Sequence, residues 1–179
     1  MQMQMLAARQ RFGPWCGQRW TNYIQWSGFH HIRELVSTDN ILCPATLDEL
    51  IDADWQHNIH ADFKTYFFHD LDYLKRRINF DPARHNILSL IERPISPTSA
   101  EINFEFCGYD ILDSFDSVSV LTNCGAFPEV FKASEVNQYG LLDDLSRSLK
   151  IAAQLREAEP HDPHCGDCRV WSLCRYVAI

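Results

Sequence analysis

The sequence predicts one α+β domain, with an antiparallel sheet and helices packed on one of its faces. Its 179 residues suit a single domain, so we take residues 1–179 as one unit. The chain is 46% hydrophobic and 12% aromatic, enough to bury a core without disulfides or a metal. Short strand-like runs alternate with helical patterns along the chain, which favours the mixed class.

The first third of the chain predicts a short N-terminal strand and two helical segments. Residues 1–6 alternate apolar residues with Gln and predict a short edge strand, although residues 1–14 also suit a flexible N-terminus. The residues compatible with one helical face are Trp15, Trp20, Tyr23, Ile24 and Trp26. Residues 46–51 predict a short helix that begins at Thr46 and is closed by Glu49 as a capping box.

The middle of the chain predicts mostly strands. Aromatic residues 66–68 and the apolar run 86–91 have the composition and length of strands. Residues 70–78 predict a helix between them. Residues 102–106 alternate as a half-buried strand does, and residues 111–121 suggest a hairpin.

The C-terminal part contains the clearest helical pattern, at residues 140–156, where leucines and alanines recur at helical spacing. Asp143 and Asp144 are expected in its first turn, where the helix dipole favours acids. Residues 161–168 then form a tight loop that leads into a final amphipathic segment. The side chains expected to point inward from that segment are Val170, Trp171 and Tyr176.

Charge is distributed unevenly along the chain, which has 24 acids, 16 bases and a net charge of −8. Residues 1–33 carry four arginines and no acid, whereas residues 34–74 carry nine acids against Lys64 alone. Residues 75–93 have a net charge of +3 and residues 94–135 of −6. This balance argues against nucleic acid as a partner and favours a basic protein partner.

The acid-rich segment contains the candidate site for partner binding. Its residues are Asp48, Glu49, Asp52, Asp54 and Trp55. On a helix, the first three would share a face and form an acidic patch beside an aromatic residue, a combination common at interfaces. An ordinary solvated helix face is the alternative. A second open question is whether the N-terminal arginines pair with this segment inside the same chain. Those arginines are Arg9, Arg11, Arg19 and Arg33.

Cysteine and histidine side chains near the C-terminus suggest a metal site as an alternative function. The candidate zinc ligands are His161, Cys165, Cys168 and Cys174. Because His164 and Cys165 are neighbours, the spacing does not match two ligand pairs across a loop, and a tight loop without metal is the interpretation we favour. We therefore expect no cofactor, with zinc as the exception to test.

The spacing Cys165-x2-Cys168-x5-Cys174 resembles the C-terminal cysteines of iron–sulfur nucleases related to RecB. That resemblance implies a fourth cysteine upstream, at Cys16 or Cys43, since such a cluster takes four thiolates. It also implies metal-binding acids, the first at Asp110 or Asp113. The next predicted strand, 118–123, offers neither the acid nor the lysine that those nucleases need, so the nuclease chemistry lacks its residues.

Cys124 is the candidate nucleophile of a third function, a cysteine-dependent hydrolase. It follows a predicted strand and precedes Gly125, a position that nucleophiles can occupy. The reaction also needs a histidine base within hydrogen-bond reach, and the sequence singles out none of its eight. A buried thiol beside a glycine turn is the simpler interpretation.

Residues 100–179 resemble small stand-alone bacterial proteins of uncharacterised function, through residues 106–113, 120–127, 137–141 and 164–171. In size and acidity the chain is similar to bacterial immunity proteins, which implies a non-enzymatic inhibitor of a basic partner such as a nuclease toxin. We also expect a cytoplasmic protein with no membrane contact. The chain lacks a basic start followed by an apolar stretch, and no window approaches the roughly 20 apolar residues of a membrane span.

Overall fold

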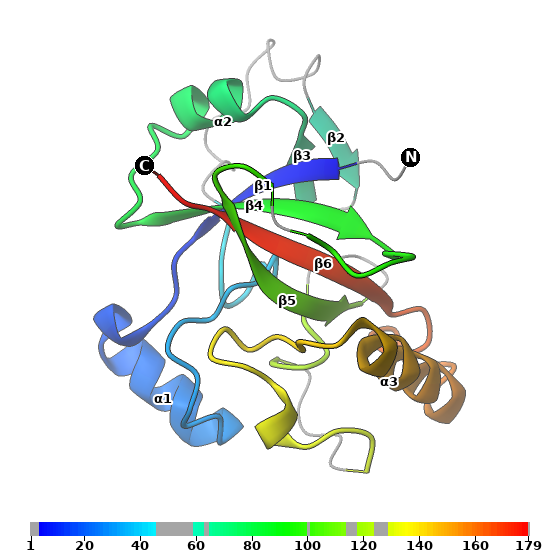
Figure 1. Cartoon of the computed structure of the whole chain (residues 1–179). Coiled ribbons are helices and arrows are strands. Elements are labelled where there is room, and N and C mark those ends of the chain that lie inside the picture. The colour runs from blue at the N-terminus through cyan, green and yellow to red at the C-terminus, as the bar shows by residue number, and fades with distance from the viewer. Residues whose placement is uncertain are drawn as a thin grey trace.

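A six-stranded sheet forms the centre of the molecule, and each neighbouring pair of strands is antiparallel (Figure 1). The computed structural model describes residues 4–45, 59–62, 65–99, 101–113, 118–123 and 129–178. The strands are β1 (Gln4–Gln10), β2 (Ile59–Asp62), β3 (Thr65–Phe68), β4 (His85–Glu92), β5 (Phe104–Leu112) and β6 (Arg169–Tyr176). Their order across the sheet is β2-β3-β1-β4-β6-β5. The predicted α+β class is confirmed.

Among the described residues, three α-helices and two short 3-10 helices surround this sheet. They are η1 (Pro14–Cys16), α1 (Gln18–Ser27), α2 (Leu71–Arg77), η3 (Ala133–Glu135) and α3 (Leu145–Ala158). In the described part of the chain, no helix has both the length and the apolar character needed to cross a membrane.

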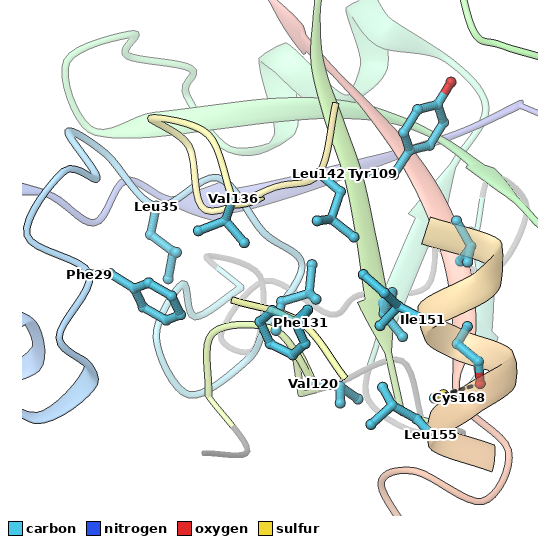
Figure 2. Packing of buried hydrophobic residues seen from close by; sticks show 14 of the residues in the cluster. Phe29, Leu35, Tyr109, Val120, Phe131, Val136, Leu142, Ile151, Leu155 and Cys168 are labelled. Carbon is cyan, nitrogen blue, oxygen red and sulfur yellow. Dashed lines mark hydrogen bonds between the residues drawn. The ribbon is translucent and has the colours of Figure 1, made fainter. Parts of the chain in front are cut away.

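One face of the sheet, here called the helix face, is covered by α2 and α3. Leu74 of α2 packs in a cluster with Leu6 and Ile87, and Ile151 of α3 lies in a cluster with Ile111. Figure 2 shows Ile151 among the buried side chains beside α3. The strand register puts Leu6, Ile87 and Ile111 on the same face, so the expected packing of helices on one face holds for α2 and α3.

The opposite face, here called the loop face, is covered by irregular chain. Val36 and Leu141 pack from the covering segments onto Trp171 and Leu173 of β6. Because both faces are covered, residues 170–174 of β6 are all buried. The prediction of an amphipathic C-terminal segment is therefore wrong, since an amphipathic strand needs one face in water.

A bulge in β5, next to Gly108, determines which acids lie on the loop face. By their register with β6, Glu105 and Asp110 both point to that face, although an uninterrupted strand would put them on opposite faces. Gly108 has a φ of 141°, and a Cβ there would lie 2.6 Å from the Cβ of Leu141. Glycine is thus required for the covering segment to approach the strand.

β1 is the clearest departure from the predicted elements. It lies between β3 and β4, so the expected edge strand is wrong. The alternation with Gln stops at Met5, and Met5 to Ala8 are all buried. A continuous apolar run of this kind is typical of a strand covered on both faces.

Most of the other predicted elements that fall on described residues are confirmed, whereas the helix predicted at residues 46–51 lies outside them. The strands expected at residues 66–68 and 86–91 are β3 and β4, and the helix expected at 70–78 is α2, with Asp70 as its N-cap. α3 begins later than predicted because Asp144 caps it, so Leu141 and Leu142 lie in the preceding loop. Of the predicted hairpin, the described residues form one isolated bridge, between Leu112 and Ser119.

α1 lies apart from the helix face, beyond the end of β1 (Figure 1). Trp20 and Tyr23 point inward, with ring centroids 5.2 and 5.5 Å from that of Phe12. Trp15 belongs to η1, and both Trp15 and Trp26 are exposed, so the predicted single aromatic face of this helix is wrong.

Candidate functional site

The predicted acidic binding site falls outside the described residues. Its five residues are Asp48, Glu49, Asp52, Asp54 and Trp55. Four other acids of the segment 34–74 have described side chains. Glu34 and Asp39 are buried, whereas Asp70 and Asp72 are exposed at the start of α2. Glu34 and Asp39 therefore lie inside the fold and are not available to a partner.

Glu34 is the centre of an ionic cluster at one end of the loop face. Its carboxylate accepts two hydrogen bonds from Arg11, at 2.8 and 2.7 Å, and one from Arg175 of β6 at 2.9 Å. Asn86 of β4 donates to the same group at 3.0 Å. The Arg175 guanidinium also bonds Glu105 and lies 5.0 Å from the centroid of the Tyr139 ring.

These contacts determine the protonation of Glu34. Burial by itself would raise its pKa, but the hydrogen bonds from Arg11 and Asn86 and the two guanidinium charges outweigh burial and lower the pKa. The negative charges of Glu34 and Glu105 likewise raise the pKa of Arg175 against the effect of its burial. These shifts favour the charged forms of Glu34 and Arg175, and the cluster ties the segment before Val36 to β4 and β6.

Asp110 is the centre of a second cluster, further along the same face. Its carboxylate accepts hydrogen bonds from the hydroxyls of Ser37 and Ser119, each at 2.7 Å, and from the amide of Ile111 at 2.8 Å. Asp39 lies beside it and accepts the backbone amide of Ser119 at 2.8 Å. The two acids thus share Ser119 and hold the turn at residues 118–123 against β5.

Burial raises the pKa of Asp110 to about 7, and the charge of Asp39 adds to this effect. The hydroxyls of Ser119 and Ser37 lower the pKa without offsetting burial. Asp110 consequently exchanges a proton near neutral pH while completely shielded from solvent. Its role in the described structure is to join three segments of the chain.

The N-terminal arginines mostly bond within the chain. Arg11 pairs with Glu34, and the buried Arg9 donates to the carbonyl of Thr38 at 3.0 Å. Arg19 donates to the carbonyl of Ile41 at 2.8 Å, whereas Arg33 is exposed. The open question about internal pairing therefore has a divided answer: three of these arginines anchor residues 34–42, Arg11 through the carboxylate of Glu34 and the other two through backbone carbonyls.

The candidate metal ligands near the C-terminus do not come together. Cys165 and Cys168 are buried under α3, and the Cys168 thiol lies 3.7 Å from the carbonyl oxygen of Ala152 (Figure 2). His161 is exposed in the preceding turn, and Cys174 lies within β6, roughly 20 Å further along the chain direction. Among the described residues, no three His, Cys, Asp or Glu side chains form a metal-binding group.

The thiols of this region are in environments that disfavour the thiolate. Burial raises the pKa of Cys165 to about 12 and that of Cys168 to about 11. Burial also raises the pKa of Cys174 to about 11. In the described structure these three cysteines are buried among core residues, as small apolar side chains are. Cys124, the candidate nucleophile, lies outside the described residues.

Sequence reasoning missed one polar pair in this region. His164 Nδ1 lies 3.1 Å from Asp113 Oδ2, and the carboxylate is buried while the imidazole is 43% exposed. Asp162 accepts the backbone amides of His164 and Cys165, which holds the backbone of the turn that carries this imidazole. A buried acid that orients an exposed imidazole can support proton transfer, but the described residues place no nucleophile against it.

Comparison with protein-family models, curated proteins and solved structures gives no match to this chain.

Proposed function

We propose that this chain is a non-enzymatic acidic protein that binds and neutralises a basic protein partner, as bacterial immunity proteins do with nuclease toxins. The observation that supports this proposal is the unbalanced charge of residues 34–74, with nine acids against Lys64. We place the protein in the cytoplasm, where such an inhibitor would meet its target.

The buried state of Glu34 and Asp39 narrows the proposed docking surface. Seven acids of the segment remain for a partner, between Asp48 and Asp72. At the C-terminal end of this range, Asp70 and Asp72 are exposed. Asp70 already caps α2 through a 2.7 Å bond to the amide of Tyr73, so Asp72 is the better partner ligand of the two.

The mechanism needs no chemical step on the partner. Clustered carboxylates steer a basic protein toward this surface and raise its association rate. They then pair with Lys or Arg side chains that would otherwise hold the phosphates of a nucleic-acid substrate. Trp55 is suited to anchor the contact, because tryptophan is enriched among the residues that dominate interface energies.

Co-expression with the product of the adjacent gene tests the proposal. We expect the two proteins to co-purify and the toxicity of that product to be suppressed. Absence of both binding and rescue would overturn the proposal. Capture of some other protein from a lysate would not support it.

A matched pair of charge variants tests the site separately. Asp48→Asn, Glu49→Gln and Asp52→Asn remove three charges from the proposed surface. Glu129→Gln, Glu157→Gln and Glu159→Gln remove three from exposed positions elsewhere and serve as the control. We expect the first triple to weaken partner binding at least tenfold more than the control, mainly through slower association (tenfold is about 1.4 kcal/mol). Equal effects of the two triples would show that net charge acts without a defined site.

A further inference from the structure

A small cavity lies on the helix face, where the chain between β4 and β5 covers the middle of the sheet. It is here called the β4–β5 pocket, and its volume of about 20 Å³ has room for one group the size of a water molecule. The strand register places Ser89, Ser172 and Cys174 at its floor. Thr98 and Glu101 line it from the covering chain, and Glu101 is exposed, so the pocket opens to solvent on that side.

Two hydroxyls of the β4–β5 pocket have no hydrogen-bond partner among the described residues. Ser172 is 1% exposed and its hydroxyl bonds no other described side chain, and the buried Oγ1 of Thr98 is likewise unpaired. The backbone amide of Thr98 donates to the hydroxyl of Tyr109 at 3.0 Å, which fixes this residue over the strands. The third hydroxyl, that of Ser89, accepts from the amide of Gln4 and keeps a second lone pair. Buried polar groups are normally paired, so the occupant of the pocket has to form hydrogen bonds.

The β4–β5 pocket is electronegative. Among the described residues that line it, Glu101 alone is charged. Its carboxylate accepts a hydrogen bond from the amide of Gln4 at 2.9 Å and forms no ion pair within the described part of the chain. The charge also reaches the floor of the pocket. Burial raises the pKa of the Cys174 thiol to about 11, and Glu101 adds to this effect without a cation to offset it.

An ammonium group has the size, the charge and the donors that this pocket requires. It is a compact cation with three N–H donors and no acceptor, which matches two unpaired hydroxyls and one carboxylate. A guanidinium is planar and spreads five donors over a wider group, so it exceeds the space available for one water-sized group. We propose that the β4–β5 pocket binds the ammonium of a lysine side chain, supplied by the basic protein partner. The source of this lysine rests on the proposed function.

The rim of the pocket favours a protein over a free amine as the source of the ammonium. Ile95 and Ile102 belong to the covering chain and are 86% and 89% exposed, the largest exposed fractions of any large apolar side chain among the described residues. Ile102 directly follows Glu101. A protein surface that inserts a lysine here would cover these isoleucines, and such a rim keeps water away from a buried polar contact.

Two-dimensional NMR of the isolated protein tests the pocket without the partner. The probes are the peptide acetyl-Gly-Lys-Gly-amide and the same peptide with arginine in place of lysine. Each is added up to about 50 mM, because a contact through one charged group has millimolar affinity at best. We expect saturable shifts at Ser172 and Cys174 with the lysine peptide and none there with the arginine peptide. The absence of saturable shifts, as for a pocket that holds only water, would overturn the proposal. An equal response to both peptides would also overturn it.

Two variants of the pocket and one control test the contacts themselves. Ser172→Ala removes an acceptor that bonds no other described side chain, so we expect unchanged stability and about tenfold weaker binding of the lysine peptide. Glu101→Gln should weaken that binding about fivefold, since the carboxylate is exposed. Glu157→Gln on the exposed side of α3 is the control and should change it by less than about twofold. Binding that neither pocket variant weakens more than the control would contradict the proposed site.

The same variants separate this proposal from the proposed function. If co-expression identifies a partner, Ser172→Ala and Glu101→Gln should weaken its binding as they weaken that of the lysine peptide. Partner binding that neither variant changes would overturn the role of the pocket and leave the proposed function in place. A lysine-specific response in the NMR titration without any partner in co-expression would support the ammonium site and contradict the proposed function.

Discussion

Two buried carboxylates on the loop face have opposite environments. Glu34 accepts hydrogen bonds from two guanidinium groups, and its pKa is lowered. Asp110 accepts from two hydroxyls and one amide, and its pKa is raised to about 7. Both clusters involve the same covering segment. Glu34 belongs to it, and Ser37, which bonds Asp110, lies only three residues further along the sequence.

The comparison shows that hydrogen bonds and opposite charge have different effects on a buried acid. Both carboxylates are well supplied with donors, yet only Glu34 has a positive charge beside it. Dipoles from hydroxyls recover part of the lost hydration, whereas a guanidinium recovers more than burial removes. Glu34 therefore keeps its charge at neutral pH, while Asp110 exchanges a proton there.

Loss of the central cation should have the largest effect. Arg175→Met keeps the side-chain length but leaves Glu34 and Glu105 without one of their shared partners. We expect the free energy of unfolding at pH 7 to fall by about 3 kcal/mol, the lower end of the cost of breaking a buried ion pair, because Arg175 is only partly buried and Arg11 still pairs with Glu34. Urea unfolding measures it. Lys150→Met on the exposed side of α3 is the control, and a loss no larger than in that control would contradict the ionic role of the cluster.

Glu34→Gln should have the next largest effect, with a defined pH dependence. The folded-state pKa of Glu34 is lowered, so its charge adds stability above the unfolded pKa and this stability is lost as pH falls. We expect a loss of about 2–3 kcal/mol at pH 7, typical of hydrogen bonds to charged groups. The difference from the original protein should shrink toward pH 3. A difference that is constant with pH would show that shape rather than charge is lost.

The sequence predicted the strands and helices of this fold better than its buried charges. The helix at 70–78 could be found because Asp70 and the leucines lie at capping and helical spacing. The Asp110 cluster could have been suspected, since an acid within the apolar run 109–112 has to be buried. The hydrogen bond from Ser37 to Asp110 could not have been predicted. It joins residues 73 positions apart, and Ser37 lies in an irregular segment. The bulge at Gly108 likewise depends on the approach of a distant loop.

The same limit explains the outcome for the candidate sites. Counting charge by segment assigned Glu34 and Asp39 to the acidic surface, although both side chains are buried. Segment charge contains no information on burial, which depends on the arginines that the fold brings near. Cysteine spacing near the C-terminus suggested a cluster, but Cys174 belongs to a strand that carries it away from Cys165. Spacing along an extended strand separates residues by about 3.3 Å each.

Asp110→Asn should change stability in the opposite sense to Glu34→Gln. Its folded pKa of about 7 lies above the unfolded value, so the original protein loses stability as pH rises from about 4 to about 7. We expect the variant to unfold with nearly the same free energy as the original at pH 5. At pH 8 it should be more stable than the original, by on the order of 2 kcal/mol. Urea unfolding at both pH values measures this, and a variant that is less stable at pH 8 would contradict the raised pKa.

Ser119→Ala should have the smallest effect, and its pH dependence tests how the hydroxyls act on Asp110. The Ser119 hydroxyl donates to Asp110 at 2.7 Å, while the backbone amide of Ser119 keeps its bond to Asp39. A hydrogen bond to an ionised group contributes about 1.5–3 kcal/mol and one between neutral groups about 1 kcal/mol. The loss should therefore be about 1 kcal/mol at pH 5, where Asp110 is protonated, and larger at pH 8. In an Asp110→Asn background the pH dependence of this loss should disappear, because the titrating group is gone. If it persists there, the hydroxyl acts on another group, and Asp39 becomes the acid to replace next.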